Sequence, residues 1–458
     1  MIQQTISPVD GRVLVERELA EGEAVERLLD RARSACASWA ATPLAERIEG
    51  IARGVDAFVA RKDELASELS WQMGRPVSQA PGEIAGFEGR ARTMLRLAPE
   101  ALAATTPAAK VGFTRWIDRE PHGVLLLLSP WNFPYLTAVN ALIPALAAGN
   151  VVVLKHSDQT PLCAERLADA FGDLPAGVFQ VVHASHDTVG RMIADPRVDA
   201  VSFTGSTAGG EAVERAAAGR FLPVGLELGG KDGAYVRSDA DPVAAADALV
   251  DGALFNSGQS CCGIERVYVQ RELFDPFVAR FAEVVRGYTL GNPLDASTNL
   301  GPMARSRGAD AVRAQVRAAL AAGATSLVDG AGFPAAGEAG PYLAPKVLID
   351  VDHSMSVMRE ETFGPLVGIQ PVDGDDHAVT LLNDSAYGLT AAVYTADLDA
   401  AQAIGRRLRV GTVFANRCDY LDPELAWVGV KASGRGCSLS VHGFAALTRL
   451  KSFHLRHP

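Results

Sequence analysis

Residues 123–156, GVLLLLSPWNFPYLTAVNALIPALAAGNVVVLKH, carry the clearest indication of the fold. Two short, entirely apolar runs, Val124–Leu128 and Val151–Leu154, lie on either side of a longer Ala-rich segment. Strands that are apolar on both faces are typical of a parallel sheet covered by helices on both sides. The stretch therefore predicts a strand, a helix and a second strand of an α/β fold.

The same alternation continues along the chain. Apolar runs predict strands at 200–203 and 234–236, and helical patterns cover 160–171 and 208–218. This succession predicts a doubly wound parallel sheet. After about Lys231 a second α/β pattern begins, with expected helices and strands at Val243–Ala253, Phe274–Tyr288, Ala309–Ala322, Val367–Val372, Ala391–Tyr394 and Thr412–Asn416, and a Gly/Pro-rich loop at Gly330–Pro345.

The two ends of the chain have different patterns. The N-terminal region is mostly helical in character, and Glu46–Leu69 carries apolar residues at helical spacing. The tail, Leu447–Leu455, alternates enough to predict an edge strand. A terminal strand of this kind often pairs with another element or subunit.

Composition limits the possible functions. The chain has 458 residues and a formal net charge of −11, which favours two or three globular domains and argues against nucleic acid as a partner. The longest apolar stretch, Ala141–Leu154, is interrupted and too short for a membrane span, and the N-terminus lacks the pattern of a secretory signal. Six Cys without CxxC spacing indicate reduced thiols, so we expect a cytoplasmic protein. The nine His show no metal-ligand spacing, so no metal site is expected.

Four segments contain residue types suited to catalysis. FNSGQSCC (255–262) places Cys261 in a loop of small residues, which suits a thiolate nucleophile; a buried Cys pair is the alternative. ELGGK (227–231) offers Glu227 as a general base, or simply a strand end and turn. SPWNFP (129–134) follows a strand and offers the Asn132 amide to an oxyanion, or is a Pro-punctuated loop. FTGSTAGG (203–210) leads from a strand into a helix, where a pyrophosphate can bind.

Taken together and in this order, these segments resemble the aldehyde dehydrogenase superfamily. Three further stretches belong to the set: LKHSD (154–158), EETFGP (360–365) and GVKASGRG (429–436). The resemblance runs from Ser129 to about Leu455 and is weaker over the N-terminal region. It implies a Rossmann-like dinucleotide-binding domain, an α/β catalytic domain and a small β oligomerisation element.

The resemblance also implies a mechanism. Cys261 would attack the aldehyde and form a thiohemiacetal, which hydride transfer to NAD(P) converts into a thioester. Asn132 and the backbone N–H of Cys261 would hold the oxyanion, and Glu227 would activate the hydrolytic water. Cys262 would be only a neighbour of the nucleophile.

Residues for the cofactor follow from the same resemblance. NAD is favoured and NADP is possible, because Asp158 stands where the family usually has Glu and its shorter carboxylate still repels a 2′-phosphate. The positions that match cofactor contacts are Lys155 and Asp158 for the adenosine ribose, Gly205 and Ser206 for the pyrophosphate, and Trp131, Glu361 and Phe363 for the nicotinamide side.

The resemblance further implies a substrate tunnel with one polar wall. Its expected lining is Phe133, Thr137, Asn140, Ser260, Cys262, Leu421 and Trp427. This lining favours a small polar or aromatic aldehyde, or a semialdehyde whose carboxylate pairs with Arg417; an Arg417 that faces solvent or another subunit is the alternative. A second departure, Cys437-Ser438 where Arg-Glu is usual, puts an ion pair in question rather than the chemistry.

Three other functions remain open on the sequence. They are a CoA-acylating dehydrogenase, in which Glu227 would have no role; a cofactor-free, nitrilase-like acylhydrolase using Cys261, Glu227 and a Lys; and a non-catalytic scaffold.

The expected domain boundaries follow from pattern and resemblance. They are 1–102 with 122–230 for the dinucleotide-binding domain, 231–432 for the catalytic domain, and 103–121 with 446–458 for the oligomerisation element. A hairpin near Pro107–Pro121 should join the tail strand. A homodimer or homotetramer is expected.

Overall fold

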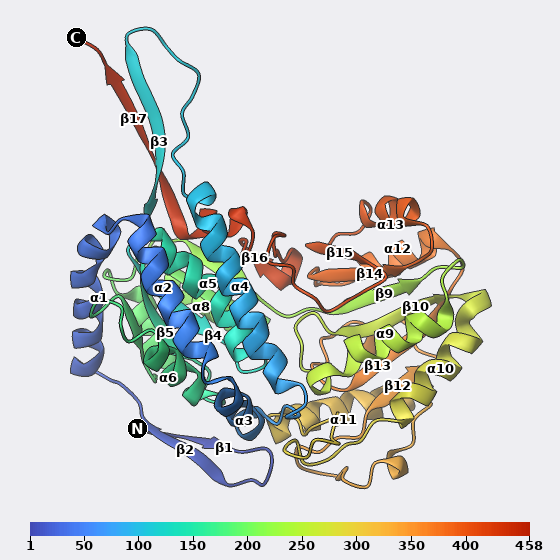
Figure 1. Ribbon diagram of the computed structural model, residues 1–458. Coiled ribbons are helices and arrows are strands. Elements are labelled where there is room, and N and C mark those ends of the chain that lie inside the picture. Colours follow the sequence, from blue (N-terminus) through green and yellow to red (C-terminus); the bar gives the residue numbers. More distant parts are fainter.

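Two sheets of mainly parallel strands form the centres of two lobes (Figure 1) in the computed structural model, which describes residues 1–458. The first sheet has the order β16-β8-β7-β4-β5-β6, and only β16 is antiparallel to its neighbour. Its strands are β4 (Val124–Ser129), β5 (Val151–His156), β6 (Phe179–Val181), β7 (Ala200–Thr204), β8 (Val224–Glu227) and β16 (Gly434–Arg435). The predicted doubly wound sheet is confirmed.

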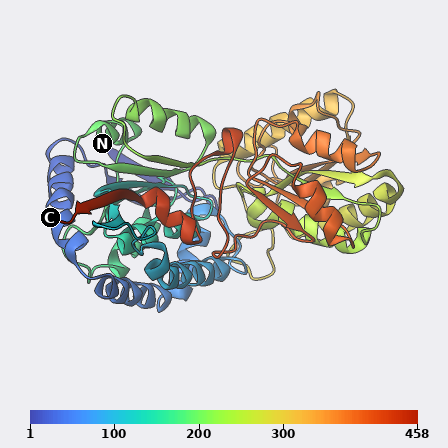
Figure 2. The same ribbon diagram turned by 90° about the horizontal axis from the view of Figure 1, so that it is seen from above.

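Helices cover both faces of this sheet (Figure 2), which explains why β4 and β5 are buried along their whole length. The helix α5 (Pro134–Ala148) shows how local sequence sets the bounds. Proline begins it, and Gly149 ends it in the left-handed conformation, at φ 96°. The other helices that accompany the sheet are α6 (Pro161–Ala170), α7 (His186–Ala194) and α8 (Thr207–Ala217).

The second sheet has the order β11-β12-β13-β10-β9-β14-β15, and only β11 is antiparallel to its neighbour. Its strands are β9 (Asp232–Val236), β10 (Ile264–Gln270), β11 (Thr325–Ser326), β12 (Lys346–Ile349), β13 (Leu366–Val372), β14 (Thr390–Tyr394) and β15 (Thr412–Ala415). Its helices are α9 (Pro242–Leu254), α10 (Phe274–Arg286), α11 (Ser306–Ala321), α12 (Asp375–Asn383) and α13 (Leu398–Gly405). After β15 the chain returns to the first lobe, where β16 pairs with β8.

The N-terminal region differs from the sequence prediction in two ways. A hairpin of β1 (Ile2–Ile6) and β2 (Val13–Glu18) precedes the helices α1 (Glu23–Ala41) and α4 (Ala80–Ala101). The predicted single helix 46–69 is two helices, α2 (Leu44–Val59) and α3 (Lys62–Met73). The break lies at Arg61, whose guanidinium binds Glu64 in the first turn of α3.

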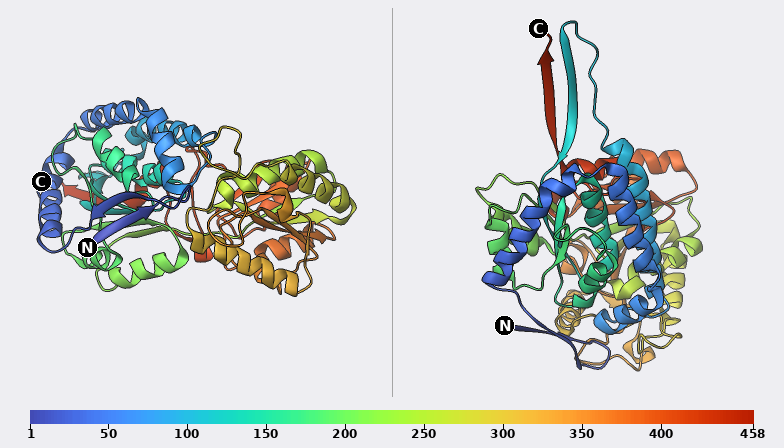
Figure 3. Two further views of the ribbon diagram at one scale, coloured as in Figure 1. Left: turned by 90° about the horizontal axis from the view of Figure 1, so that it is seen from below. Right: turned by 60° about the vertical axis from the view of Figure 1, so that its left-hand side comes forward.

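A two-stranded arm stands away from the lobes (Figures 1 and 3). It consists of β3 (Phe113–Pro121) and the tail strand β17 (Thr448–Arg456), paired antiparallel over nine residues each. Near 107–121 the predicted hairpin is limited to two isolated bridges, Lys110–Phe113 and Thr105–Ile117, and the continuous partner of β3 is the distant tail strand. Separately, no helix of the structure is long and apolar enough to cross a membrane.

Candidate active site

The carboxyl ends of four parallel strands bring the predicted site residues to one edge of the first sheet. Trp131 and Asn132 follow β4, Lys155 closes β5, and Glu227 closes β8. Gly205 and Ser206 follow β7 in the same way. Ligands bind at this edge in open α/β sheets because the loops there are free to form a crevice.

The loop that carries Cys261 is held in an unusual backbone conformation. After α9 the chain turns through a single 3₁₀ turn, Phe255–Gly258, in which Asn256 and Ser257 have φ of 53° and 57°. Gly258 has φ 69°, and a Cβ there would lie 2.3 Å from the carbonyl oxygen of Gly364. Only glycine fits both the conformation and this contact. The nucleophile loop is therefore fixed against the EETFGP segment.

Asn132 is bound to the same loop. Its Nδ2 donates to the carbonyl oxygen of Gln259 at 3.2 Å, and its own carbonyl oxygen accepts from Nδ2 of Asn256 at 3.0 Å. Asn132 is buried. Only Ser260 therefore separates Gln259, which anchors the Asn132 side-chain amide, from Cys261.

A buried ion pair that the sequence analysis did not identify supports this arrangement. Arg75 lies between α3 and α4, pairs with Glu83 of α4, and donates to Asn256 Oδ1 at 3.2 Å. Oε1 of Glu83 accepts from the backbone N–H groups of Tyr135 and Leu136, at 2.8 and 3.2 Å. The pair thus ties the start of α5 to the cysteine loop. Its members have no distinctive sequence context, so only their burial reveals them.

Glu227 lines the same cavity as this pair. Its carboxylate accepts a hydrogen bond from the hydroxyl of Ser438. Burial raises the pKa of Glu227, while Ser438 and the positive charge of Arg90 oppose the rise. Ser438 belongs to the Cys437-Ser438 departure, which was expected to put an ion pair in question rather than the chemistry. The structure corrects this, because Ser438 contacts the candidate base itself.

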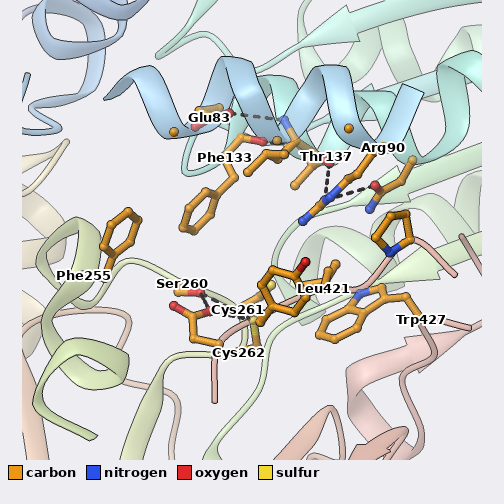
Figure 4. A pocket seen from close by; sticks show the side chains of 18 of the residues that line it. Glu83, Arg90, Phe133, Thr137, Phe255, Ser260, Cys261, Cys262, Leu421 and Trp427 are labelled. Atoms are coloured by element: carbon orange, nitrogen blue, oxygen red, sulfur yellow. Dashed lines mark hydrogen bonds between the residues drawn. The ribbon is translucent and has the colours of Figure 1, made fainter. Parts of the chain in front are cut away.

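A cavity of about 520 Å³ joins these groups (Figure 4). It contains Cys261 and Glu227 together with every residue predicted for the tunnel. The predicted lining residues found there are Phe133, Thr137, Asn140, Ser260, Cys262, Leu421 and Trp427; residues not predicted include Glu83, Arg90, Asp419 and Tyr420.

The two adjacent cysteines have different environments. Sγ of Cys262 donates to Oδ1 of Asp419 at 2.9 Å, and the Ser260 hydroxyl donates to the same oxygen at 3.0 Å. A hydrogen bond with Cys261 and burial raise the pKa of Cys262 well above its ordinary value. Cys262 is therefore a protonated, buried thiol, whereas Cys261 is partly accessible.

Arg417 is not in the cavity. Its side chain is exposed, and its guanidinium stacks on the ring of Tyr420 at 3.8 Å. The structure agrees with the alternative, an Arg417 that faces solvent. The arginine that does line the cavity is Arg90, on α4.

A second group of predicted residues forms a candidate cradle for a dinucleotide. Ser206 caps α8 by accepting from the N–H of Gly209 at 3.2 Å, which leaves the first-turn amides of α8 for an anion. At Gly205 a Cβ would lie 2.6 Å from the ring of Phe203. The bare backbone at this turn fits a pyrophosphate.

The residues predicted for the nicotinamide side come from both lobes, with Trp131 after β4 and with Glu361 and Phe363 before β13. Oε1 of Glu361 accepts from the N–H of Gly230 at 3.0 Å, and a Cβ on Gly229 would collide with that carboxylate at 2.2 Å. Burial raises the pKa of Glu361 to about 7. Trp131 and Phe363 meet edge-to-face with ring centroids 5.6 Å apart. The double glycine thus permits the close approach of Glu361.

The adenosine side contains one ion pair that was not predicted. Asp158 pairs with Arg305, which precedes α11. Burial acts to raise the pKa of Asp158, but the charge and hydrogen bond of Arg305 outweigh it and the pKa is lowered. Lys155 is buried, and burial lowers its pKa. Asp158, the predicted acceptor for a ribose hydroxyl, is thus an ionised carboxylate whose charge is balanced by Arg305.

Comparison with known proteins decides the family. The sequence model described as "Aldehyde dehydrogenase family" matches residues 2–453. The chain belongs to this family. The predicted resemblance is therefore confirmed, and with it the fold.

Relatives of the chain match it over almost its whole length. It is 34% identical to the 2-hydroxymuconic semialdehyde dehydrogenase of Pseudomonas sp. (strain CF600), covering 98% of this chain and 95% of the relative. It is 35% identical to succinate-semialdehyde dehydrogenase [NADP(+)] 1 of Mycobacterium tuberculosis, covering 98% of each. The solved structure of an NAD-dependent aldehyde dehydrogenase from Sinorhizobium meliloti superposes with a TM-score of 0.95 at 35% identity, covering 100% of this chain and 91% of that one. This aldehyde dehydrogenase is an oxidoreductase that uses NAD(P) to oxidise an aldehyde.

Proposed function

We propose that this aldehyde dehydrogenase oxidises a small polar aldehyde to its acid through a thioester on Cys261. The observation that carries the proposal is the cavity that holds Cys261, Glu227 and the polar wall of Thr137 and Asn140 together. The anchoring of the Asn132 amide to the carbonyl of Gln259, beside the nucleophile, supports it.

The residues act in sequence. Sγ of Cys261 adds to the carbonyl carbon, and the second N–H of the Asn132 amide and the backbone N–H of Cys261 stabilise the oxyanion. The cradle residues would hold NAD(P), which would supply the hydride acceptor. Loss of hydride from the thiohemiacetal leaves an acyl group on Cys261. Glu227 then takes a proton from water, the hydroxide attacks the thioester, and the acid leaves Cys261 free.

The cradle supports NAD as the cofactor, with NADP accepted. Asp158 offers an ionised acceptor to a ribose 2′-hydroxyl and repels a 2′-phosphate. Arg305 reduces that repulsion by pairing with Asp158. Use of either cofactor agrees with the relatives, because the M. tuberculosis enzyme is named for NADP(+) and the S. meliloti enzyme is described as NAD-dependent.

The two alternatives that use the same thiol receive less support. A nitrilase-like triad needs a lysine beside the thiol, but Nζ of Lys231 is buried against Glu265 at 2.6 Å and Thr362 at 3.0 Å. A CoA-acylating enzyme has no use for Glu227, which here is placed in the cavity.

The test is reduced-nicotinamide absorbance with purified protein, NAD or NADP, and a panel of aldehydes, without CoA. We expect reduced cofactor from the wild type and none from Cys261→Ala. Glu227→Gln should give a single turnover and then stop, because the acyl group is formed but not hydrolysed. The buried neighbour supplies the control, since Cys262→Ala should retain turnover. Reduced cofactor that appears only with CoA would contradict the proposal.

Three further assignments belong to the proposal. The boundaries 1–102 with 122–230, 231–432, and 103–121 with 446–458 agree with the two sheets and the arm, with the addition that β16 joins the first sheet. The projecting arm supports a homodimer or homotetramer. The six free cysteines support a reducing, cytoplasmic location.

A further inference from the structure

We infer that Arg90 binds an anionic group of the substrate, so that the preferred aldehyde carries a carboxylate away from its carbonyl group. The inference rests on the proposed function and names the substrate class of the same cavity. It gives α4 a role in the selection of the substrate, although the sequence indicated no functional residue in this helix.

The guanidinium of Arg90 is held but not neutralised. One nitrogen, Nη1, donates to the carbonyl oxygen of Leu136 at 2.7 Å and to Oδ1 of Asn140 at 3.1 Å. Nε and Nη2 have no partner in the chain, and no carboxylate oxygen lies within 4.0 Å of the group. The group therefore presents free N–H donors from a fixed position.

Arg75, the other arginine at this site, is an example of a guanidinium that is paired with a carboxylate. Arg75 is fully enclosed and pairs directly with Glu83. Both arginines line the same cavity, yet only Arg75 has a carboxylate in direct contact. Burial lowers the pKa of the partly exposed Arg90, and an anionic group bound in the cavity would pair with its free N–H donors.

The charges around Arg90 leave room for such an anion. The acidic groups that contribute at Arg90 are Glu227, Cys261, Cys262 and Tyr420. Burial raises the pKa of Glu227, and the pKa of Cys262 is well above its ordinary value. Asp419, also in the cavity, has its pKa raised by burial and accepts from the Cys262 thiol. None of these groups forms an ion pair with Arg90.

The placement of Arg90 suits a bifunctional substrate. Figure 4 shows Arg90 reaching into the cavity from α4, across from the loop of Cys261, with Thr137 beside it and Leu421 and Trp427 facing it. When the aldehyde carbon of a short substrate lies at Cys261, the other end of the substrate points toward Arg90. The planar guanidinium binds a carboxylate with directional, charge-assisted hydrogen bonds.

The first test compares two aldehydes of equal length, 4-oxobutanoate and butanal, at a pH where Glu227 is ionised. In the wild type we expect kcat/KM to favour 4-oxobutanoate by at least tenfold. Arg90→Gln should lower kcat/KM for 4-oxobutanoate by about 10- to 100-fold and for butanal by less than about threefold. Arg417→Gln, an exposed arginine outside the cavity, should leave the ratio unchanged.

Two results would overturn the inference. One is a higher kcat/KM for butanal than for 4-oxobutanoate in the wild type. This result does not depend on the folding of any variant. The other is an equal loss for both aldehydes in Arg90→Gln, which would mean that Arg90 supports Cys261 or Glu227 rather than the substrate.

A second measurement separates this inference from the proposed function. Butanedioate should slow the alkylation of Cys261 by iodoacetamide in the wild type and in Arg417→Gln, but not in Arg90→Gln. This readout needs neither cofactor nor turnover, so it stands even if no aldehyde is oxidised. Equal protection of all three proteins would contradict anion binding at Arg90.

Discussion

At the residue scale, burial and one hydroxyl group act in opposite directions on the pKa of Glu227. Burial raises its pKa, whereas the hydrogen bond from Ser438 favours the charged carboxylate. A general base must be ionised to accept a proton from water, so thioester hydrolysis is lost as the pH falls through this raised pKa. Ser438 is therefore a positioning residue for the base.

Ser438→Ala should move the acid limb of the hydrolysis rate to higher pH by about one unit, because a hydrogen bond to a charged group contributes about 1.5 kcal/mol. The rate above that limb should change little. The measurement is the pH profile of acyl-enzyme breakdown. Ser440→Ala, a nearby buried serine that does not contact Glu227, is the control. An unshifted limb with a uniformly lower rate would show that Ser438 only supports the fold.

At the element scale, the two loops that precede the adjacent parallel strands β10 and β13 meet at one glycine. Gly258 of the cysteine loop lies against Gly364 of the segment that carries Glu361 and Phe363. The loop that holds the nucleophile and the loop proposed to hold the nicotinamide are thus fixed relative to each other by backbone contact.

Gly258→Ala should lower the free energy of unfolding by about 2 kcal/mol or more, because a Cβ there meets both a left-handed φ and a carbonyl oxygen at 2.3 Å. Activity should fall with it. Gly190→Ala in α7, where a Cβ would meet no atom within 4 Å, should change the stability by less than about 1 kcal/mol, in the stabilising direction. Denaturant unfolding measures both, and equal effects would contradict the argument.

At the scale of the whole molecule, the arm exposes apolar side chains that the single chain does not cover. Leu450 and Leu455 of β17 are 64% and 49% exposed, and Trp116 stacks on Phe453 across the two strands with centroids 4.3 Å apart. The arm projects from the lobes (Figure 3), so the proposed homodimer or homotetramer would bury this apolar surface against another subunit.

Replacing Leu450 and Leu455 by Asp should reduce the particle to a single chain of 48.2 kDa, measured by light scattering. Both leucines are exposed within one chain, so the pairing of β3 with β17 should survive. Phe221→Ala, which removes a fully exposed apolar side chain away from the arm, should leave the particle mass unchanged. An unchanged mass for the double variant would place the subunit contact elsewhere.

The sequence by itself determined the features that depend on local pattern. Apolar runs such as 124–128 and 151–154 became buried strands because a strand with two apolar faces has no stable place outside a sheet covered on both sides. The stretch 46–69 was less well predicted, since helical periodicity does not reveal the break at Arg61. The family, the nucleophile loop and the tunnel lining also followed from short, ordered segments.

Only the tertiary structure decided which charges meet. Ser438 reaches Glu227 across 211 residues of sequence, and Arg90 reaches Asn140 across 50. The sequence does not distinguish Arg90 from Arg417. In the structure Arg90 lies in the cavity without an ion-pair partner, whereas Arg417 stacks on Tyr420 outside it. The physical reason is that a charged side chain acquires its role from desolvation and from its partners, and both are set by packing between distant segments.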